Sequence, residues 1–228
     1  MHLQPKQGVQ QIQDLPGMMR GEFRGFATSP VAGVRFVERL DALGAIHTPD
    51  CAAVIWLRPD EAPLYQWLAN LSAVHLPQIR EILRSDTIRS AMKRIVADMP
   101  NDPERAMFVQ SISVLAEKFA DVMRAPWLRL RLEVVTGDAC RKFHVDNVTA
   151  RLVCTYRGTG TQYGLAPRGA EPEVVDTVPT GQPIVLRGMR WPTTPPSLLK
   201  HRSRPIAGTG ETRLLLVLDP ILDPEDEA

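Results

Sequence analysis

The sequence has 228 residues, of which 44% are hydrophobic and 23% are charged, and its formal net charge is +1. This composition is ordinary for a globular domain, and the near-neutral charge disfavours nucleic acid as a bulk partner. The sequence predicts neither a transmembrane helix nor a signal peptide, and three cysteines are too few for a disulfide framework, so we expect a cytoplasmic protein with reduced thiols.

The first part of the chain changes from irregular to strand-like. Residues 1–50 are rich in turn residues and are predicted to be partly irregular, with one short amphipathic piece at residues 34–43. Residues 52–57 form a compact apolar run between Pro-Asp pairs, which suits a buried strand.

A helical region follows this strand. Apolar residues recur at helical spacing in residues 60–71, 77–83 and 86–97. Asp102 is a suitable N-cap, and Pro103 at the first helical position predicts the start of a longer helix that ends at Met123. We therefore expect residues 51–125 to be a strand and a helical support region.

After Pro126 the pattern changes to short strands. The segment WLRLRLEVV alternates apolar and charged residues, which indicates a half-buried strand. Such closely spaced strands are typical of a sandwich or barrel at residues 126–222, so the fold class is α+β, and an acidic tail follows at residues 223–228. The candidate strands span residues 127–135, 140–145, 150–156, 161–165, 173–177, 183–187, 198–202 and 212–219.

The chemistry is predicted by the segment Phe143-His144-Val145-Asp146. Alternate side chains of a strand point to the same face, so His144 and Asp146 can bind one metal ion together. His201, on a later candidate strand, is the best third ligand. The sequence therefore predicts a mononuclear metal site formed by His144, Asp146 and His201.

Two histidines and one carboxylate form the facial triad of non-haem Fe(II) oxygenases, which leaves coordination positions open for a 2-oxo acid and dioxygen. The far carboxylate of a 2-oxo acid needs a cation. Arg213 lies in the strand-like run TRLLLVLD, and a tight return of the preceding loop would bring it beside His201. Its guanidinium suits bidentate capture of a carboxylate.

Cysteine offers a rival set of ligands. Cys140 and Cys154 flank the His-x-Asp motif, and thiolates would favour zinc. However, an extended strand would hold Cys140 too far from His144 for one ion to bridge them. Cys154 lies in an apolar strand, where a buried and inert thiol is the expected role.

Two blocks, CRKFHVDNVTARLVCTYRGTGTQY and HRSRPIAGTGETRLLLVLD, resemble a bacterial family known only as a domain of unknown function. With the strand at residues 52–58, the resemblance spans most of the chain. It implies a soluble bacterial protein of a kind associated with metal (zinc) homeostasis genes.

The same blocks are more distantly similar to prolyl-hydroxylase-like Fe(II)/2-oxoglutarate dioxygenases. That resemblance implies a double-stranded β-helix (a jelly-roll or cupin-like barrel) preceded by supporting helices. It assigns the metal to the same triad and implies that 2-oxoglutarate binds to Arg213, Thr155 and Tyr156. Because Arg213 follows the distal histidine slightly later than in that family, Arg204 or Arg151 could replace it as the partner of the co-substrate.

Three functional hypotheses remain open from the sequence. The first is an Fe(II)- and 2-oxoglutarate-dependent oxygenase of unknown substrate. The second is a non-redox protein that binds Zn(II) with the same triad and acts in metal handling. The third is a metal-free barrel that acts as an interaction domain.

Overall fold

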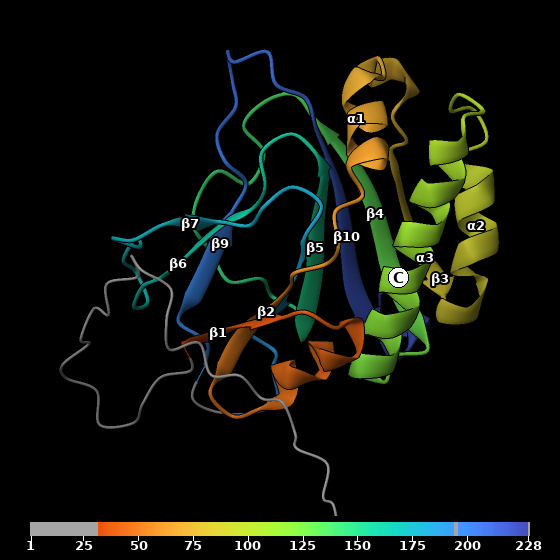
Figure 1. Cartoon of the computed structure of the whole chain (residues 1–228). Helices are drawn as coiled ribbons and strands as arrows, with labels where there is room; N and C mark the ends of the chain where they lie inside the picture. The colour runs from red at the N-terminus through yellow and green to blue at the C-terminus, as the bar shows by residue number, and fades with distance from the viewer. Residues whose placement is uncertain (1–31, 194–195, 228) are drawn as a thin grey trace, which may run out of the picture.

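The computed structural model describes residues 32–193 and 196–227, which form a mixed α+β structure in three layers (Figure 1). A seven-stranded sheet occupies the middle, with α1, α2 and α3 on one side and a three-stranded sheet on the other. The predicted α+β class is confirmed. Most of the irregular segment expected at residues 1–50, namely residues 1–31, and residue 228 of the expected tail lie outside the described residues.

The large sheet has the strand order β1-β2-β8-β5-β10-β4-β3. Its neighbouring strands run antiparallel except for the parallel pair β1–β2. The sheet thus combines strands from the region expected to give support with strands from the region expected to form the barrel. The strands are β1 (Gly33–Val37), β2 (Cys51–Trp56), β3 (Ile79–Arg84), β4 (Trp127–Val135), β5 (Ala150–Arg157), β8 (Pro183–Arg187) and β10 (Arg213–Ile221).

The small sheet has the order β7-β6-β9 and is antiparallel throughout. Its strands are β6 (Gln162–Leu165), β7 (Asp176–Thr177) and β9 (Leu199–Arg202). The α-helices are α1 (Ala62–Asn70), α2 (Ile88–Ile95) and α3 (Pro103–Met123). Short 3-10 helices are η1 (Leu40–His47), η2 (Ala73–His75), η3 (Ser85–Thr87) and η4 (Pro224–Glu227). None of the helices in the described residues is long and apolar enough to cross a membrane.

The long helix α3 begins and ends at the predicted residues, Pro103 and Met123. Pro103 occupies the first turn after Asp102, which is extended. The carboxylate of Asp102 caps no backbone amide and instead accepts a hydrogen bond of 2.7 Å from Nε1 of Trp67 on α1. Arg124 ends the helix in the left-handed conformation, with φ of 52°.

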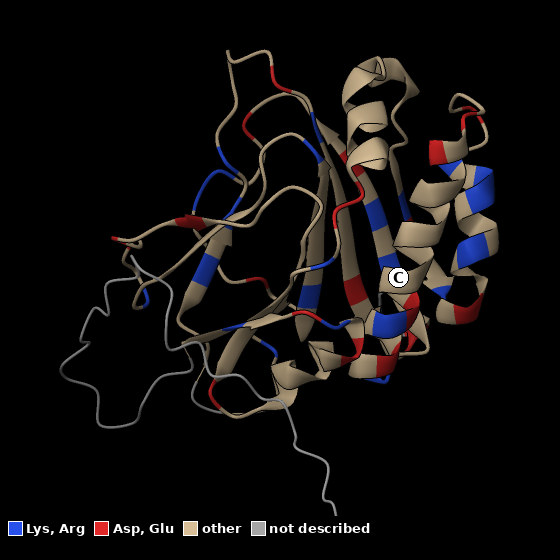
Figure 2. Ribbon diagram, viewed as in Figure 1, with Lys and Arg blue, Asp and Glu red and all other residues tan. Residues whose placement is uncertain are grey.

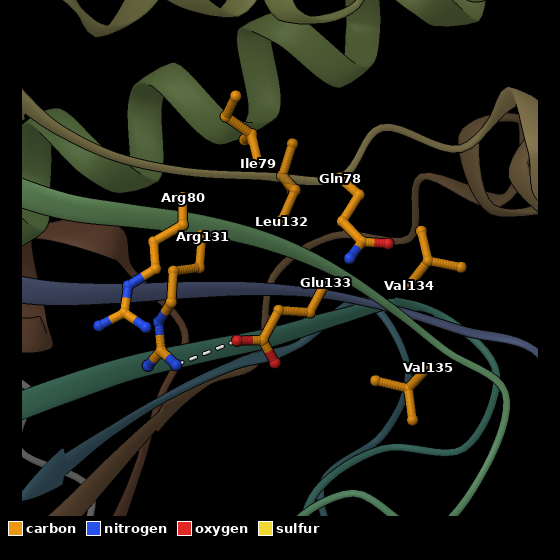
Figure 3. Close-up of a pocket in the computed structure, with 8 residues that line it drawn as sticks. All are labelled: Gln78, Ile79, Arg80, Arg131, Leu132, Glu133, Val134 and Val135. Carbon is orange, nitrogen blue, oxygen red and sulfur yellow. Dashed lines mark hydrogen bonds and ion pairs between the residues drawn. The ribbon is translucent and has the colours of Figure 1, made fainter.

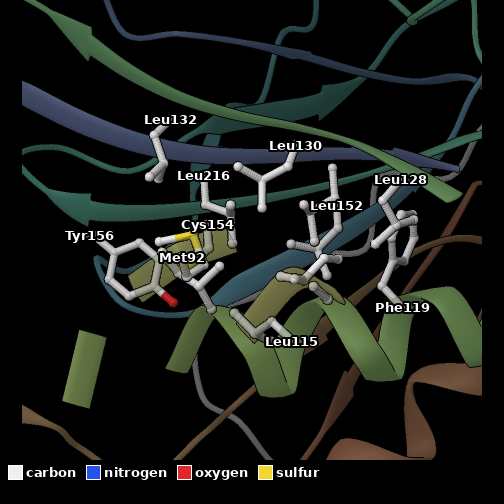
Figure 4. Close-up of a cluster of buried hydrophobic side chains, with 14 of the residues drawn as sticks. Met92, Leu115, Phe119, Leu128, Leu130, Leu132, Leu152, Cys154, Tyr156 and Leu216 are labelled. Carbon is white, nitrogen blue, oxygen red and sulfur yellow. The ribbon is translucent and has the colours of Figure 1, made fainter. Parts of the chain in front are cut away.

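The alternation in β4 divides the interior into two hydrophobic clusters. Leu128, Leu130 and Leu132 point toward the helices and join a cluster with α3 (Figure 4). Val135 belongs to a second cluster, which includes residues of the large sheet and of β6 and β9. The large sheet therefore has a helix-facing side and an inner side that faces the small sheet.

The prediction of helix at residues 77–83 is wrong, because Ile79–Arg84 forms strand β3. Ile79 and Leu83 fit both a helical and an alternating pattern. Pairing along β4, from Ile79 opposite Leu132 to Arg84 opposite Trp127, decides between them.

Two predicted strands are shorter than expected. In residues 140–145 only one isolated bridge forms, between His144 and His201, and Cys140 has a positive φ of 48° that interrupts extended structure. In residues 173–177 only Asp176 and Thr177 pair. The remaining C-terminal strands form close to their predicted bounds.

Candidate metal centre

A single β-bridge brings the two distant histidines together. The amide of His144 donates to the carbonyl of His201 at 3.1 Å, and the amide of His201 donates back at 3.0 Å. As a directly opposed pair they place their rings close, with centroids 4.6 Å apart. The prediction that His201 returns beside the His-x-Asp motif is consistent with this geometry.

Asp146 completes the cluster. Its Oδ1 lies 3.5 Å from Nε2 of His144, and its Oδ2 lies 3.0 Å from Nε2 of His201. One ligand atom from each of the three residues lies within 4.8 Å of the others. Asp146 and His201 are buried, whereas His144 is half-buried, so the cluster opens to solvent on the His144 side.

The loop that carries Asp146 is held by a close backbone approach. The amide of Met189 donates to the carbonyl of Asp146 at 2.8 Å. A Cβ atom at Gly188 would lie 1.9 Å from the carbonyl oxygen of Val148, so only glycine fits at this position. The turn after β8 therefore holds the backbone of Asp146 in place.

The protonation states suit a cation. A backbone carbonyl can only accept, so Nδ1 of His144 donates to the carbonyl of Lys142 at 2.8 Å, and Nε2 is the nitrogen that faces Asp146. The contact with Asp146 raises the pKa of His144, so a metal ion at Nε2 would take the place of a proton there. Burial lowers the pKa of His201, which favours the neutral ring. Burial opposes ionisation of Asp146, but the close approach of both histidine rings and the charge of Arg151 hold its pKa well below the usual range.

One polar atom of the cluster lacks a partner. Oδ2 of Asp146 is buried and makes no hydrogen bond, although Nε2 of His201 is 3.0 Å away. Buried carboxylate oxygens rarely remain unsatisfied, because desolvation without a partner is costly. A divalent ion between these atoms would satisfy the carboxylate and both imidazoles.

Arg151 and Asp219 support the carboxylate from behind. Arg151 contacts Oδ1 of Asp146 through one terminal nitrogen and binds Asp219 in a bidentate manner, at 2.6 and 2.9 Å. Asp219 is 1% exposed. Arg151, the alternative partner of the co-substrate, is thus already engaged with two carboxylates.

This support was not predicted from the sequence. Arg151 and Asp219 lie at the ends of two neighbouring strands, and their pairing depends on tertiary structure. A usable signal was Asp219 itself, an acidic residue at the end of the otherwise apolar run LLLVL. A buried acid in such a strand requires a cationic partner.

Arg213 is fully buried at the start of β10. It lies opposite Val135 of β4 and on the same side as Leu215, so it points to the inner side of the sheet. Its Nε donates to the carbonyl of Thr159 at 2.6 Å, whereas both terminal nitrogens are buried without a hydrogen-bond partner. Burial lowers the pKa of Arg213 and the charge of Glu211 raises it, yet a guanidinium remains charged, and no ion pair joins it to any residue that the structure describes. Its terminal nitrogens therefore need an anion.

Thr155 also presents an unsatisfied group on the inner side. Its Oγ1 is buried without a partner, and Thr155 on β5 pairs with Leu215, which lies two residues after Arg213 on β10. Gly158 makes room for this arrangement, because a Cβ there would lie 2.9 Å from Cγ of Arg213. Arg213 and Thr155 therefore offer donors to the same space between the sheets.

Tyr156, which the sequence assigned to the co-substrate together with Thr155, lies on the helix-facing side of the sheet. Successive residues of a strand face opposite sides, so Thr155 and Tyr156 cannot share a site. Tyr156 points into the helix-facing cluster (Figure 4). Its hydroxyl lies 2.7 Å from Oγ of Ser111, and its ring packs edge-on against Phe108.

Arg204 and the two cysteines near the His-x-Asp motif occupy different positions in the fold. Arg204 is exposed in the loop between β9 and β10. Cys154 is fully buried in the helix-facing cluster, where burial raises its pKa to about 11, and Cys140 is exposed. Neither thiol belongs to the cluster formed by the triad.

Comparison with known proteins gives a family and a fold. The family model described as "Protein of unknown function (DUF1826)" matches residues 38–219. No curated protein matches the sequence. Solved structures that resemble the chain include a dioxygenase for auxin oxidation from rice, at 13% identity, 85% coverage of this chain, 84% of that chain and a TM-score of 0.49.

A second similar structure is dioxygenase for auxin oxidation 1 from Arabidopsis thaliana in a binary complex with 2-oxoglutarate. It is 9% identical, covers 83% of this chain and 92% of that chain, and has a TM-score of 0.50. A prolyl-4-hydroxylase from Pseudomonas putida is 13% identical over 72% of this chain and 96% of that chain, with a TM-score of 0.33. At such low identity the likeness to the Arabidopsis protein is a likeness of fold.

Proposed function

The chain belongs to the family of proteins of unknown function DUF1826, and from that premise we propose that it is an Fe(II)- and 2-oxoglutarate-dependent oxygenase of the hydroxylase type. In this proposal the two facing sheets form a double-stranded β-helix. His144, Asp146 and His201 hold the metal, and Arg213 with Thr155 holds the far carboxylate of 2-oxoglutarate. The fold likeness to a dioxygenase described with bound 2-oxoglutarate supports the proposal.

The buried guanidinium of Arg213 is the observation that carries this proposal. A metal carrier needs only the triad, whereas an unpaired cation in the interior costs several kcal/mol. Both terminal nitrogens of Arg213 lack partners, and the hydroxyl of Thr155 is unsatisfied on the neighbouring strand. A dicarboxylate that binds the metal at one end and Arg213 at the other would satisfy both.

The chain's own residues provide binding, orientation and exclusion of water. Arg151 and Asp219 fix the carboxylate of Asp146, and the carbonyl of Lys142 fixes the tautomer of His144. The apolar cluster with Val153, Leu215 and Val217 lines the inner side of the sheet and excludes water. When bound, iron and 2-oxoglutarate would supply dioxygen activation coupled to oxidative decarboxylation.

Anaerobic addition of Fe(II) and 2-oxoglutarate to the full chain tests the proposal. We expect a weak visible charge-transfer band, followed by iron-dependent release of succinate when air is admitted. His144→Ala should remove both signals. His75→Ala is the matched control, because His75 is exposed in η2 and distant in sequence from the triad.

A zinc-binding role gives a different result in the same experiment. Two histidines and one aspartate also suit Zn(II) with an open position. Tight zinc binding with neither a band nor succinate in the presence of iron would contradict the oxygenase proposal and favour a role in metal handling.

A further inference from the structure

The inner side of β3 and β4 carries a row of arginines outside the metal cluster. On β4 the charged residues Arg129, Arg131 and Glu133 alternate with the leucines that face the helices. On β3, Arg80 lies directly opposite Arg131. Figure 2 shows Lys or Arg at several positions along the strand that Figure 1 labels β4.

Two arginines directly opposite each other on neighbouring strands concentrate positive charge, and here only one of the two has carboxylate partners. Figure 3 shows the guanidinium groups of Arg80 and Arg131 directed to the same side. Arg131 is paired with Glu133 at 3.0 Å and with Asp219 at 3.4 Å, but its Nε is buried and unpartnered. Arg80 is exposed and makes no hydrogen bond or ion pair with any residue that the structure describes.

A hollow lies at this pair of arginines. Its volume is about 470 Å³, and its lining includes Gln78, Arg80, Arg131, Glu133 and Val135 (Figure 3). Ligand pockets commonly have volumes of roughly 300–1,000 Å³. The hollow thus has the size and the charge for a small anionic molecule or for one anionic group of a larger molecule.

The hollow is connected to the metal cluster by direct contacts. Arg131 contacts Asp219, Asp219 binds Arg151, and Arg151 contacts the candidate metal ligand Asp146. On the other side Val135, which lines the hollow, lies opposite Arg213. The hollow is therefore linked to the metal cluster through three successive ion pairs, and one of its lining residues is the strand neighbour of Arg213.

We propose that this hollow binds the substrate, and that the substrate carries a carboxylate or phosphate group held by Arg80 and Arg131. This inference rests on the proposed oxygenase function and names the substrate class for the same site. The planar forks of two guanidinium groups can engage several oxygens of one oxyanion. Bound there, the anion gives Arg80 the partner that it lacks among the described residues and positions the rest of the molecule toward the metal.

Titration of the metal-free full chain with inorganic phosphate, and separately with benzoate, tests the site. We expect at least one probe to shift the NMR resonances of the Nε–H groups of Arg80 and Arg131. The probe that binds more tightly shows whether the substrate carries a phosphate or a carboxylate group. Arg80→Gln should weaken its affinity by about tenfold, as expected for loss of charge-assisted hydrogen bonds. Arg84→Gln on the same strand is the control. Arg84 is already paired with Asp86, so this substitution should leave the affinity for the probe unchanged.

A second experiment, with a paramagnetic metal ion, tests whether the probe binds near the metal cluster. With Mn(II) bound to the triad, nuclear relaxation of the bound probe should be enhanced in the wild type, and Arg80→Gln should remove the enhancement. The proposal is overturned if neither probe shifts the arginine resonances, if Arg80→Gln binds as well as wild type, or if Mn(II) leaves relaxation unchanged. Binding that depends on Arg80, without iron-dependent succinate release, would remove the oxygenase function but keep the anion site.

Discussion

The two sides of the large sheet use buried arginine in opposite ways. On the helix-facing side, Arg58 donates to Oγ of Ser111 at 2.9 Å, contacts the hydroxyl of Tyr65 and lies 3.3 Å from Glu61. On the inner side, both terminal nitrogens of Arg213 are buried without partners. Arg58 leaves only its Nε without a partner, whereas Arg213 leaves both terminal nitrogens unsatisfied. The comparison teaches that burial alone does not indicate a site, whereas a buried guanidinium with both terminal nitrogens unsatisfied indicates a missing ligand.

The largest effect is expected for a substitution that removes the metal and leaves the other residues of the inner side unchanged. Asp146→Asn keeps the shape of the side chain but removes its charge, so we expect metal affinity to fall by more than about 100-fold, beyond the loss typical of supporting residues. Metal content after dialysis measures this. Asp86→Asn, which alters an exposed aspartate paired with Arg84, should retain the metal; equal loss in both variants would contradict the site.

A pair of substitutions tests the two arginines directly. Arg213→Met removes an unpaired buried charge, so the metal-free protein should gain about 1–3 kcal/mol in free energy of unfolding. Arg58→Met removes satisfied hydrogen bonds and should lose about 1–3 kcal/mol. Denaturant unfolding of both variants gives the sign of each change in the free energy of unfolding. Changes of the same sign would contradict the proposed difference between the two arginines.

Asp219 extends the comparison to the support of the metal. Asp219→Asn leaves Arg151 without its bidentate partner, so we expect metal affinity to fall by roughly 10–100-fold. Glu133→Gln at the half-exposed end of the same chain of ion pairs should change it little. Metal titration measures the metal affinity of the two variants, and an equal loss of affinity in both would show that Asp219 has no special role.

The smallest effect is expected for Tyr156→Phe. The variant loses one hydrogen bond with Ser111 and should cost about 1 kcal/mol of stability, with no change in affinity for 2-oxoglutarate. Thermal unfolding with and without the co-substrate measures both quantities. A large loss of affinity would mean that Tyr156 does reach the site and that the division into two sides is wrong.

The sequence predicted what depends on local pattern. Strand β4 was predicted from the strict alternation of apolar and charged residues, and helix α3 from Asp102-Pro103 and its apolar face. The triad was predicted from His144 and Asp146, which are two residues apart, and from one distant histidine, His201. β3 was missed because its apolar residues fit two periodicities, and pairing with β4 decides between them.

The rest of the site depends on pairings between distant strands. Arg151 meets Asp219 only because β5 and β10 are neighbours, and Arg80 meets Arg131 only because β3 extends the sheet. The sequence placed Thr155 and Tyr156 in one site, although strand geometry sends adjacent residues to opposite sides. Side assignment therefore needs the register, which a single sequence does not provide.

Calorimetric titration of 2-oxoglutarate into the Fe(II)-loaded protein without oxygen, in the wild type and in Arg213→Met, tests the central claim most directly. If the unpaired guanidinium awaits the far carboxylate, the wild type should bind and the variant should bind at least about 10-fold more weakly while it retains its iron. Equal affinity in the two proteins, or no binding to the iron-loaded wild type, would contradict the account.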